Sequence, residues 1–149
     1  MQYFIYTNLE RVFAVCNAIA FLGWLLLVFL PGWKITQKLV VSGGVSLVLA
    51  AIYLLFVVTF FGQASGGFTS LDGVNALFSH KPTLLAAWIH YLVFDLFVGA
   101  WEVADSRRIK MPHLLVVPCL ILTFLLGPIG FLLYHAVSLR WRKKSGENI

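Results

Sequence analysis

The sequence predicts an all-α integral membrane protein, a four-helix bundle that forms one transmembrane domain over residues 1–149. Two observations support this fold class. The chain of 149 residues is 60% hydrophobic and only 11% charged, with a mean hydropathy of +0.90. A soluble domain of this size could not cover so much apolar surface with so few charges. The apolar residues also gather into segments that are long enough to cross a bilayer.

The four expected helices cover about residues 12–30, 39–61, 83–105 and 114–139. Pro31 and Gly32 end the first helix, and the aromatic and basic pair that follows anchors it at an interface. The longest connection is Gly62–Pro82, whose centre at residues 69–78 forms either a short amphipathic helix or an irregular loop. Because Pro128 lies inside the fourth helix, we expect a kink near this residue.

Four spans would place both termini and the Gly62–Pro82 connection on the same side of the membrane. Lys and Arg flank the two sides about equally, so the positive-inside rule hardly orients the bundle. The densest basic cluster is Arg140–Lys144. We therefore expect cytoplasmic termini, in a bacterial inner membrane or a photosynthetic membrane. The formal net charge of +5 fits contacts with membrane lipid head groups, whereas nucleic-acid binding would need a basic face on a soluble module.

The third helix carries polar side chains that a purely structural span does not need. They are His90, Asp95 and Glu102. A carboxylate near the middle of a membrane helix costs about 2.5–3.5 kcal/mol on insertion scales, so it marks a functional site by default. At about 100° per residue, Asp95 and Glu102 share one face of the helix and His90 lies on another. These three residues are our candidate catalytic residues.

Each candidate also has a simpler structural interpretation. Glu102 and Asp105 can form an interfacial salt-bridge network with the basic residues of the following turn, or Glu102 can pair with His113. Asp95 is either a hydrogen-bonded packing acid or a protonatable catalytic group. His90 can simply donate a hydrogen bond to a backbone carbonyl of another helix. The sequence does not choose between these alternatives.

Several aromatic and hydroxyl side chains of the last two helices are candidates for contacts with an apolar substrate. They are Trp88, Tyr91, Trp101, Thr123 and Tyr134. Aromatic residues in such helices more often face lipid, which is the simpler interpretation. The four His residues are scattered and the two Cys residues lie inside apolar segments, so their spacing fits no metal site. We expect neither a metal nor a cofactor, and the sequence has no phosphate-binding loop or nucleophile–base motif.

Two stretches of the C-terminal half resemble the ABA-deficient-four-like family. Residues Trp88–Trp101 contain Ile-His-x4-Asp-Leu-Phe, and Pro118–Gly130 begins with Pro-Cys-Leu and ends with Phe-Leu-x-Gly-Pro-x-Gly. The chain is also similar to that family in its length and its expected number of helices. The resemblance implies a four-helix membrane protein of plastids or bacteria, with a carotenoid or another apolar isoprenoid as its substrate or ligand.

The plant member of that family is required for making neoxanthin from violaxanthin, so the resemblance implies chemistry of this kind. That reaction is a redox-neutral isomerisation, which opens an epoxide and removes a proton to leave an allene. It requires an acid for the epoxide oxygen and a base for the lost proton. A desolvated Asp95 could be the acid, with His90 or Glu102 as the base. We therefore expect an isomerase-like enzyme of carotenoid metabolism.

A protein of another class remains open. The chain could be a non-catalytic pigment-binding or accessory subunit of a larger membrane complex, because its aromatic residues are many and it lacks an obvious catalytic cluster. A homo-oligomer is also compatible with the sequence. A transporter or proton relay ranks third, because four spans without an internal repeat would require such an oligomer.

Overall fold

A computed structural model describes residues 7–145 of the chain. These residues form helices, turns and connections without a strand, which confirms the all-α fold class. Three helical segments are long and apolar enough to cross a membrane, by length and composition: α2 (Leu9–Phe29), the segment Lys34–Phe60, and α6 (Lys81–Arg108).

The second of these segments is not one regular helix. It begins with the single turn α3 (Lys34–Thr36) and a short π-helix, η1 (Gln37–Val41), and continues as α4 (Gly44–Phe60). The centre of the long connection is helical, as one of the two alternatives predicts. This helix, α5 (Leu71–Phe78), has Ser70 as its N-cap, whose hydroxyl accepts a hydrogen bond from Gly73 N at 3.0 Å.

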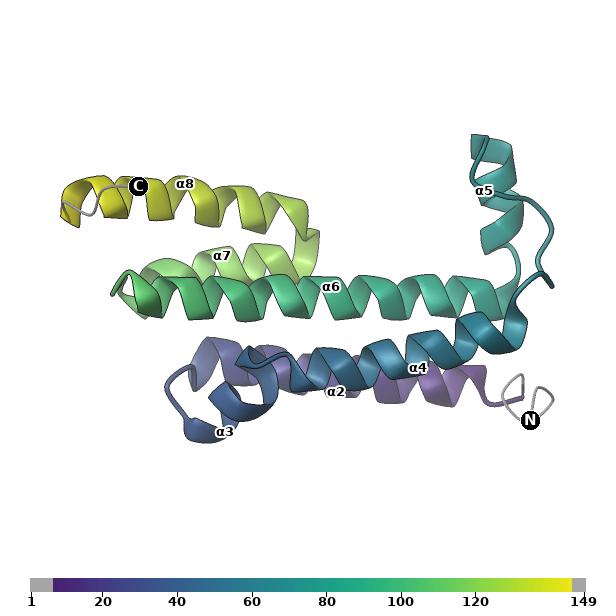
Figure 1. The fold of residues 1–149 in the computed structure, drawn as a ribbon, viewed down its shortest axis with the longest axis horizontal. Coiled ribbons are helices and arrows are strands. Elements are labelled where there is room, and N and C mark those ends of the chain that lie inside the picture. Colours follow the sequence, from purple (N-terminus) through teal and green to yellow (C-terminus); the bar gives the residue numbers. More distant parts are fainter. Residues whose placement is uncertain (1–6, 146–149) are drawn as a thin grey trace.

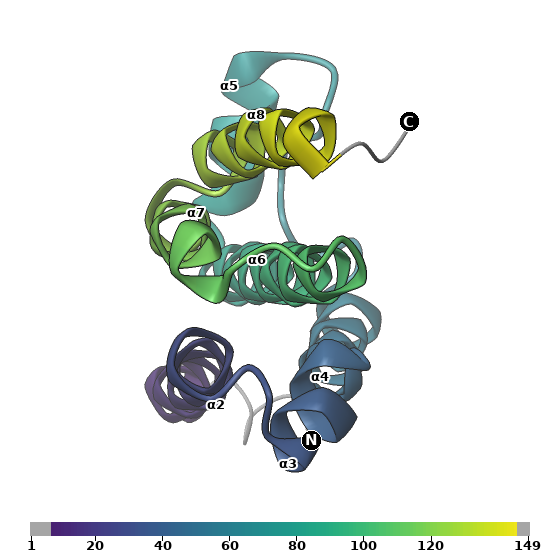
Figure 2. The ribbon, with the colours of Figure 1, turned by 90° about the vertical axis from the view of Figure 1, so that its left-hand side faces the viewer.

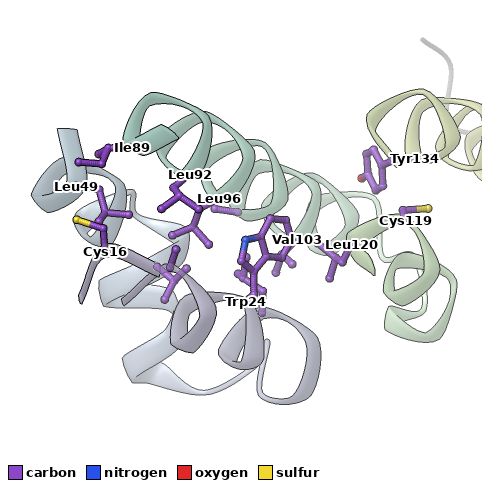
Figure 3. Packing of buried hydrophobic residues seen from close by; sticks show 14 of the residues in the cluster. Cys16, Trp24, Leu49, Ile89, Leu92, Leu96, Val103, Cys119, Leu120 and Tyr134 are labelled. Atoms are coloured by element: carbon purple, nitrogen blue, oxygen red, sulfur yellow. The ribbon is translucent and has the colours of Figure 1, made fainter. Parts of the chain in front are cut away.

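Helix α6 lies at the centre of the molecule (Figures 1 and 2). It contacts α2 and α4 on one side, and α7 and α8 on the other. Buried apolar side chains follow its whole length, among them Ile89, Leu96 and Val103, each 0% exposed (Figure 3). Gly99 leaves room for the indole of Trp24, since a Cβ atom there would come within 2.6 Å of the ring. The apolar packing of the chain is therefore organised around α6.

The fourth expected helix is two helices, so the expectation of four helices with one kink is wrong for this segment. Helix α7 (His113–Leu126) runs back along α6, and α8 (Pro128–Ser145) then reverses and packs on α7 (Figure 1). The reversal occurs at Gly127, whose φ of 43° and ψ of −93° suit a residue without a side chain. Pro128 cannot continue α7 because it has no N–H, but it readily starts the next helix.

The reversal changes which parts of the chain meet. The tail of α8 lies at the end of the molecule where α6 joins α7, and not at the end where α2 begins (Figure 1). The expectation that the two terminal segments share one end is therefore wrong. Of the eleven Lys and Arg residues, all except Arg11 and Lys81 lie in the segments 34–38, 107–110 and 140–144. We call the end of the molecule where these segments meet the basic end.

Candidate functional site

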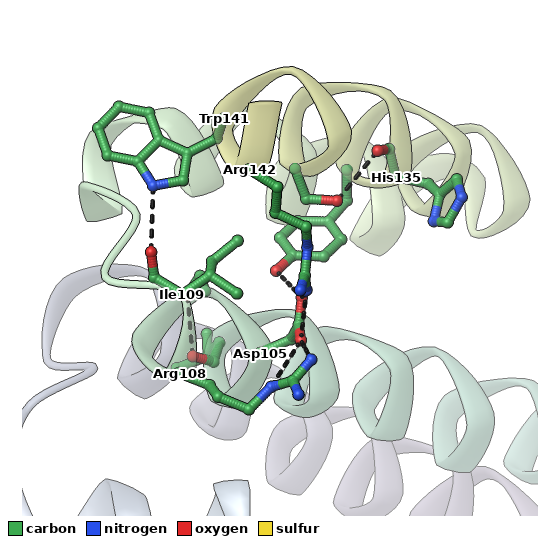
Figure 4. A network of polar contacts seen from close by, with 10 residues as sticks. Asp105, Arg108, Ile109, His135, Trp141 and Arg142 are labelled. Atoms are coloured by element: carbon green, nitrogen blue, oxygen red, sulfur yellow. Dashed lines mark hydrogen bonds and ion pairs between the residues drawn. The ribbon is translucent and has the colours of Figure 1, made fainter. Parts of the chain in front are cut away.

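At the basic end, Asp105 is the centre of a polar network (Figure 4). Its carboxylate accepts hydrogen bonds from Arg108 at 2.7 Å, Arg142 at 2.8 Å and the hydroxyl of Tyr134 at 2.9 Å. The side chain of Asp105 is only 7% exposed. The indole N–H of Trp141 donates to the carbonyl of Ile109 at 3.1 Å. These bonds fix α8 to the end of α6, which is a structural task.

Glu102 lies one turn before Asp105 and is fully buried. Its Oε1 accepts a hydrogen bond from Thr123 Oγ1 of α7 at 2.9 Å, and its Oε2 has no hydrogen-bond partner within residues 7–145. Glu102 does not form the expected contacts. It takes no part in the salt bridges of the turn, and it does not pair with His113. Nε2 of His113 instead lies 2.9 Å from the carbonyl oxygen of Val28.

Asp95 lies midway along the 28-residue helix α6, where the chain turns from α7 into α8. A Cβ atom on Gly127 would lie 3.0 Å from Oδ1 of Asp95, so the carboxyl group touches the backbone of the turn. Oδ2 is buried and has no hydrogen-bond partner among the described residues. The rest of the side chain is partly exposed. Within residues 7–145, one oxygen of Asp95 is therefore left without a hydrogen-bond partner.

Two predicted substrate-contact residues lie on the same side of α6 as Asp95. The hydroxyl of Tyr91 lies beside the Asp95 carboxyl and 3.5 Å from the carbonyl oxygen of Phe124. The ring of Trp88 packs 5.3 Å from that of Tyr91, and its indole N–H donates to Asn17 Oδ1 at 3.2 Å. Both rings are more than a third exposed. Trp88, Tyr91 and Asp95 thus form an accessible strip on α6, which we call the Asp95 strip.

The other three predicted contact residues lie toward the basic end. Thr123 and Tyr134 are 0% exposed, and their hydroxyl groups are bonded to Glu102 and Asp105. The ring of Trp101 packs 5.4 Å from that of Tyr134 and is 41% exposed. An apolar ligand could therefore reach Trp101, whereas the two hydroxyl residues face the interior.

His90 lies on the other side of α6, at a pocket of about 710 Å³ between α4, α5 and α6. The connection at residues 61–68 closes one side of it. Six of the residues that line it carry a phenyl or phenol ring: Tyr53, Phe56, Phe60, Phe61, Phe68 and Phe78. The ring of His90 packs 4.6 Å from Phe94 and edge-on, at 5.7 Å, to Tyr53. We call this hollow the α5 pocket.

The structure therefore brings Asp95 and Tyr91 together, and it separates both from His90. Glu102 shares a face of α6 with Asp95, but it is enclosed by α7. No group of three His, Cys, Asp or Glu residues within residues 7–145 is arranged to hold a metal ion. Chemically, the Asp95 strip can exchange a proton with a bound molecule, and the α5 pocket can hold an apolar one.

Tyr53 and Arg142 belong to these sites but were not predicted from the sequence. An aromatic residue every third or fourth position from Tyr53 to Phe60 marks one helix face, and this pattern could have indicated the wall of the α5 pocket. No sequence signal connects Arg142 to Asp105, because their contact depends on the reversal at Gly127.

Comparisons with known proteins give one family and one curated relative. The family model described as ABA DEFICIENT 4-like matches residues 11–134. The protein ABA DEFICIENT 4, chloroplastic, of Arabidopsis thaliana is 32% identical over 114 residues, which cover 70% of this chain and 52% of the relative. The chain thus spans about half the length of the curated relative. No solved structure matches the chain.

Proposed function

The chain belongs to the ABA DEFICIENT 4-like family, and on this premise we propose that it is an integral membrane protein of carotenoid or related isoprenoid metabolism. Its three long apolar helices support a place in the membrane. The chloroplast location in the relative's name fits a photosynthetic membrane. An apolar isoprenoid would then reach the protein from within the bilayer.

We propose that the chemistry is a redox-neutral, isomerase-like reaction at Asp95. The observation that carries this proposal is the buried oxygen of Asp95, which has no hydrogen-bond partner among the described residues and lies midway along α6. A carboxyl group in this position is costly for the fold, so a role in proton transfer gives a reason for its presence.

The proton transfers balance with one carboxyl group. Protonated Asp95 gives its proton to the oxygen of an epoxide, and the C–O bond breaks with its electron pair kept by oxygen. The carboxylate then accepts a proton from a neighbouring carbon, and the electron pair of the broken C–H bond forms the new C=C bond. The hydroxyl of Tyr91, beside the carboxyl group, can bind the same oxygen during the reaction. No oxidant or reductant is needed.

The other two candidate catalytic residues fit this step less well. Glu102 is fully buried and bonded to Thr123, so it can influence the reaction only through the packing of α7. His90 is exposed, but it lies on the side of α6 that faces the α5 pocket. A role of His90 as the base would require neighbouring atoms of the substrate, the epoxide oxygen and the carbon that loses its proton, to lie on opposite sides of α6.

The test of the catalytic proposal is Asp95→Asn, which keeps the size of the side chain and removes the acid. The protein is expressed in cells that make epoxy-carotenoids, and the pigments are separated by chromatography. We expect a new product with the parent chain and none with Asp95→Asn. The matched control is Asp72→Asn, because Asp72 is an exposed acid on α5. Unchanged product from Asp95→Asn would refute the proposal.

The second candidate is a non-catalytic pigment-binding or accessory subunit of a larger membrane complex. The α5 pocket favours it, since the part of its wall formed by residues 7–145 contains no Asp or Glu. In the same experiment, this function predicts unaltered pigment that co-purifies with the parent chain, without any new product.

We further propose that the basic end faces the cytoplasm or its organellar equivalent, as the positive-inside rule favours. Helix α7 is about 21 Å long at 1.5 Å per residue, which is shorter than the hydrocarbon core of about 30 Å. The hairpin of α7 and α8 would then be re-entrant, with its turn inside the bilayer and sheltered by α6.

This orientation can be tested with two exposed serines, Ser65 in the α5 connection and Ser145 at the end of α8. Each is changed to Cys, and intact cells are treated with a membrane-impermeant maleimide. We expect labelling of Ser65→Cys and no labelling of Ser145→Cys until the membrane is opened. The native Cys16 and Cys119 are buried, and the parent chain controls for them. Equal labelling of the two variants in intact cells would contradict the re-entrant arrangement.

A further inference from the structure

The α5 pocket has the properties of a site for a neutral ligand. Its volume of about 710 Å³ lies within the range of small-molecule pockets, about 300–1,000 Å³. Among the described residues that line it, none is Asp, Glu, Lys or Arg. A charged ligand would lose its hydration without gaining a partner of opposite charge, so an uncharged molecule fits this wall better.

The pocket also offers two hydrogen-bonding groups that the chain leaves free. Within residues 7–145, no hydrogen bond is formed by the ring nitrogens of His90 or by the hydroxyl of Tyr53. The rings of these two residues pack edge-on, with their centroids 5.7 Å apart, and both residues line the pocket. Thr83, also on the wall, is already 2.9 Å from Nδ1 of His80. One oxygen of a ligand could therefore bind at His90 and Tyr53.

The exposed aromatic residues of the connection point to a ligand as well. Phe61 is 84% exposed and Phe68 is 81% exposed, although both line the pocket. A ligand in the pocket would cover part of these rings and gain from the burial of apolar surface. A rigid ring would lose less conformational freedom on binding than a flexible acyl chain would.

From these observations we propose that the α5 pocket binds the neutral cyclic end group of an isoprenoid lipid, with its one oxygen bound by His90 and Tyr53. The isoprenoid class rests on the proposed function, whereas the neutral ring and the single oxygen follow from the pocket itself. The pocket is a binding site, separate from the proton transfer at Asp95.

The first test uses radiolabelled β-ionone, a cyclic isoprenoid ketone, and the full chain in phosphatidylcholine nanodiscs. Ala87 lines the pocket, so Ala87→Trp fills it. The matched control is Ala104→Trp on the same helix, at an exposed position outside the pocket. We expect saturable binding by the parent chain and the control, and at least tenfold weaker binding by Ala87→Trp. Absent binding by the parent, or equal binding by Ala87→Trp, would overturn the proposal.

The second test concerns the oxygen. His90→Phe keeps an aromatic ring and removes the ring nitrogens. It should weaken β-ionone binding about five- to tenfold, which corresponds to the loss of one hydrogen bond, and leave binding of the same ring without its ketone unchanged. Tyr53→Phe should act in the same way. If these variants weakened the binding of both probes equally, the assignment of the ligand's oxygen to His90 and Tyr53 would be wrong.

A third measurement separates the ring from a lipid chain and this proposal from the proposed function. Oleyl alcohol, a neutral flexible chain with one oxygen, should not displace β-ionone, and displacement would show that the pocket takes lipid chains. Asp95→Asn should bind β-ionone like the parent. Intact β-ionone binding by a parent chain that forms no product would refute the catalytic proposal alone, whereas product formation without β-ionone binding would refute the pocket alone.

Discussion

The two ends of this molecule differ in how their polar groups are used. At the basic end, the carboxylate of Asp105 accepts bonds from two arginines and a tyrosine. At the opposite end, the α5 pocket leaves the polar groups of His90 and Tyr53 without hydrogen bonds inside the described part of the chain. Bonds formed within the chain stabilise the fold, whereas free groups in a pocket can bind another molecule. Asp95, halfway between the two ends, also has an oxygen without a hydrogen-bond partner among the described residues.

The largest expected effect is at the basic end. Asp105→Ala leaves Arg142 and the hydroxyl of Tyr134 without their partner at a nearly buried position. Breaking a buried ion pair typically destabilises a protein by about 3–5 kcal/mol. We expect a clearly lower midpoint of thermal unfolding in detergent micelles.

The matched control for this variant is Asp72→Ala, because Asp72 is exposed on α5. Its midpoint should stay close to that of the parent. Equal midpoints for Asp105→Ala and the parent would show that the network does not hold α8 in place.

A smaller effect is expected at the turn between α7 and α8. Gly127→Ala places a Cβ atom at a φ of 43° and 3.0 Å from Oδ1 of Asp95. We expect a destabilisation of about 1–3 kcal/mol. Gly62→Ala is the control, since Gly62 has a φ of 73° but open space around the added atom. The difference between the two variants in thermal unfolding measures the contact with Asp95 together with the backbone strain at Gly127, and equal values would contradict that contact.

The smallest effect on stability is expected at the pocket end. Gly66 has a φ of 98°, and a Cβ atom there would collide with the carbonyl oxygen of Gly73 in α5. Helix α5 has no buried residue, so Gly66→Ala should displace the α5 connection without unfolding the bundle. We expect an unfolding midpoint near that of the parent and weaker β-ionone binding. A large drop in the midpoint would mean that both ends stabilise the fold alike.

The difference between the two ends also explains what the sequence could predict. The apolar composition and the helical spacing of α6 predict the fold class and the shared face of Asp95 and Glu102, because both depend on local pattern. The reversal at Gly127 was not predicted, because the apolar residues continue across Pro128 and a kink satisfies the same pattern. The contacts of Arg142 and Tyr134 with Asp105 depend on this reversal.

The sequence also leaves open which residues of α6 and α7 lie level with each other. A hairpin centred near Arg108 would place Asp95 level with residues 119–123. Helix α6 ends at Arg108 and α7 begins at His113, so the centre lies between these residues. The partner of each α6 residue therefore moves about one helical turn along α7, which brings Asp95 to Gly127.

The most direct test of the account measures the pigment that co-purifies with Asp95→Asn from cells that make epoxy-carotenoids. The account assigns binding to the α5 pocket and proton transfer to Asp95. We expect the variant to carry no product. The amount of unaltered pigment on the variant should equal the total amount of pigment, substrate and product together, on the parent. Product at the parent level in the Asp95→Asn variant would contradict the account.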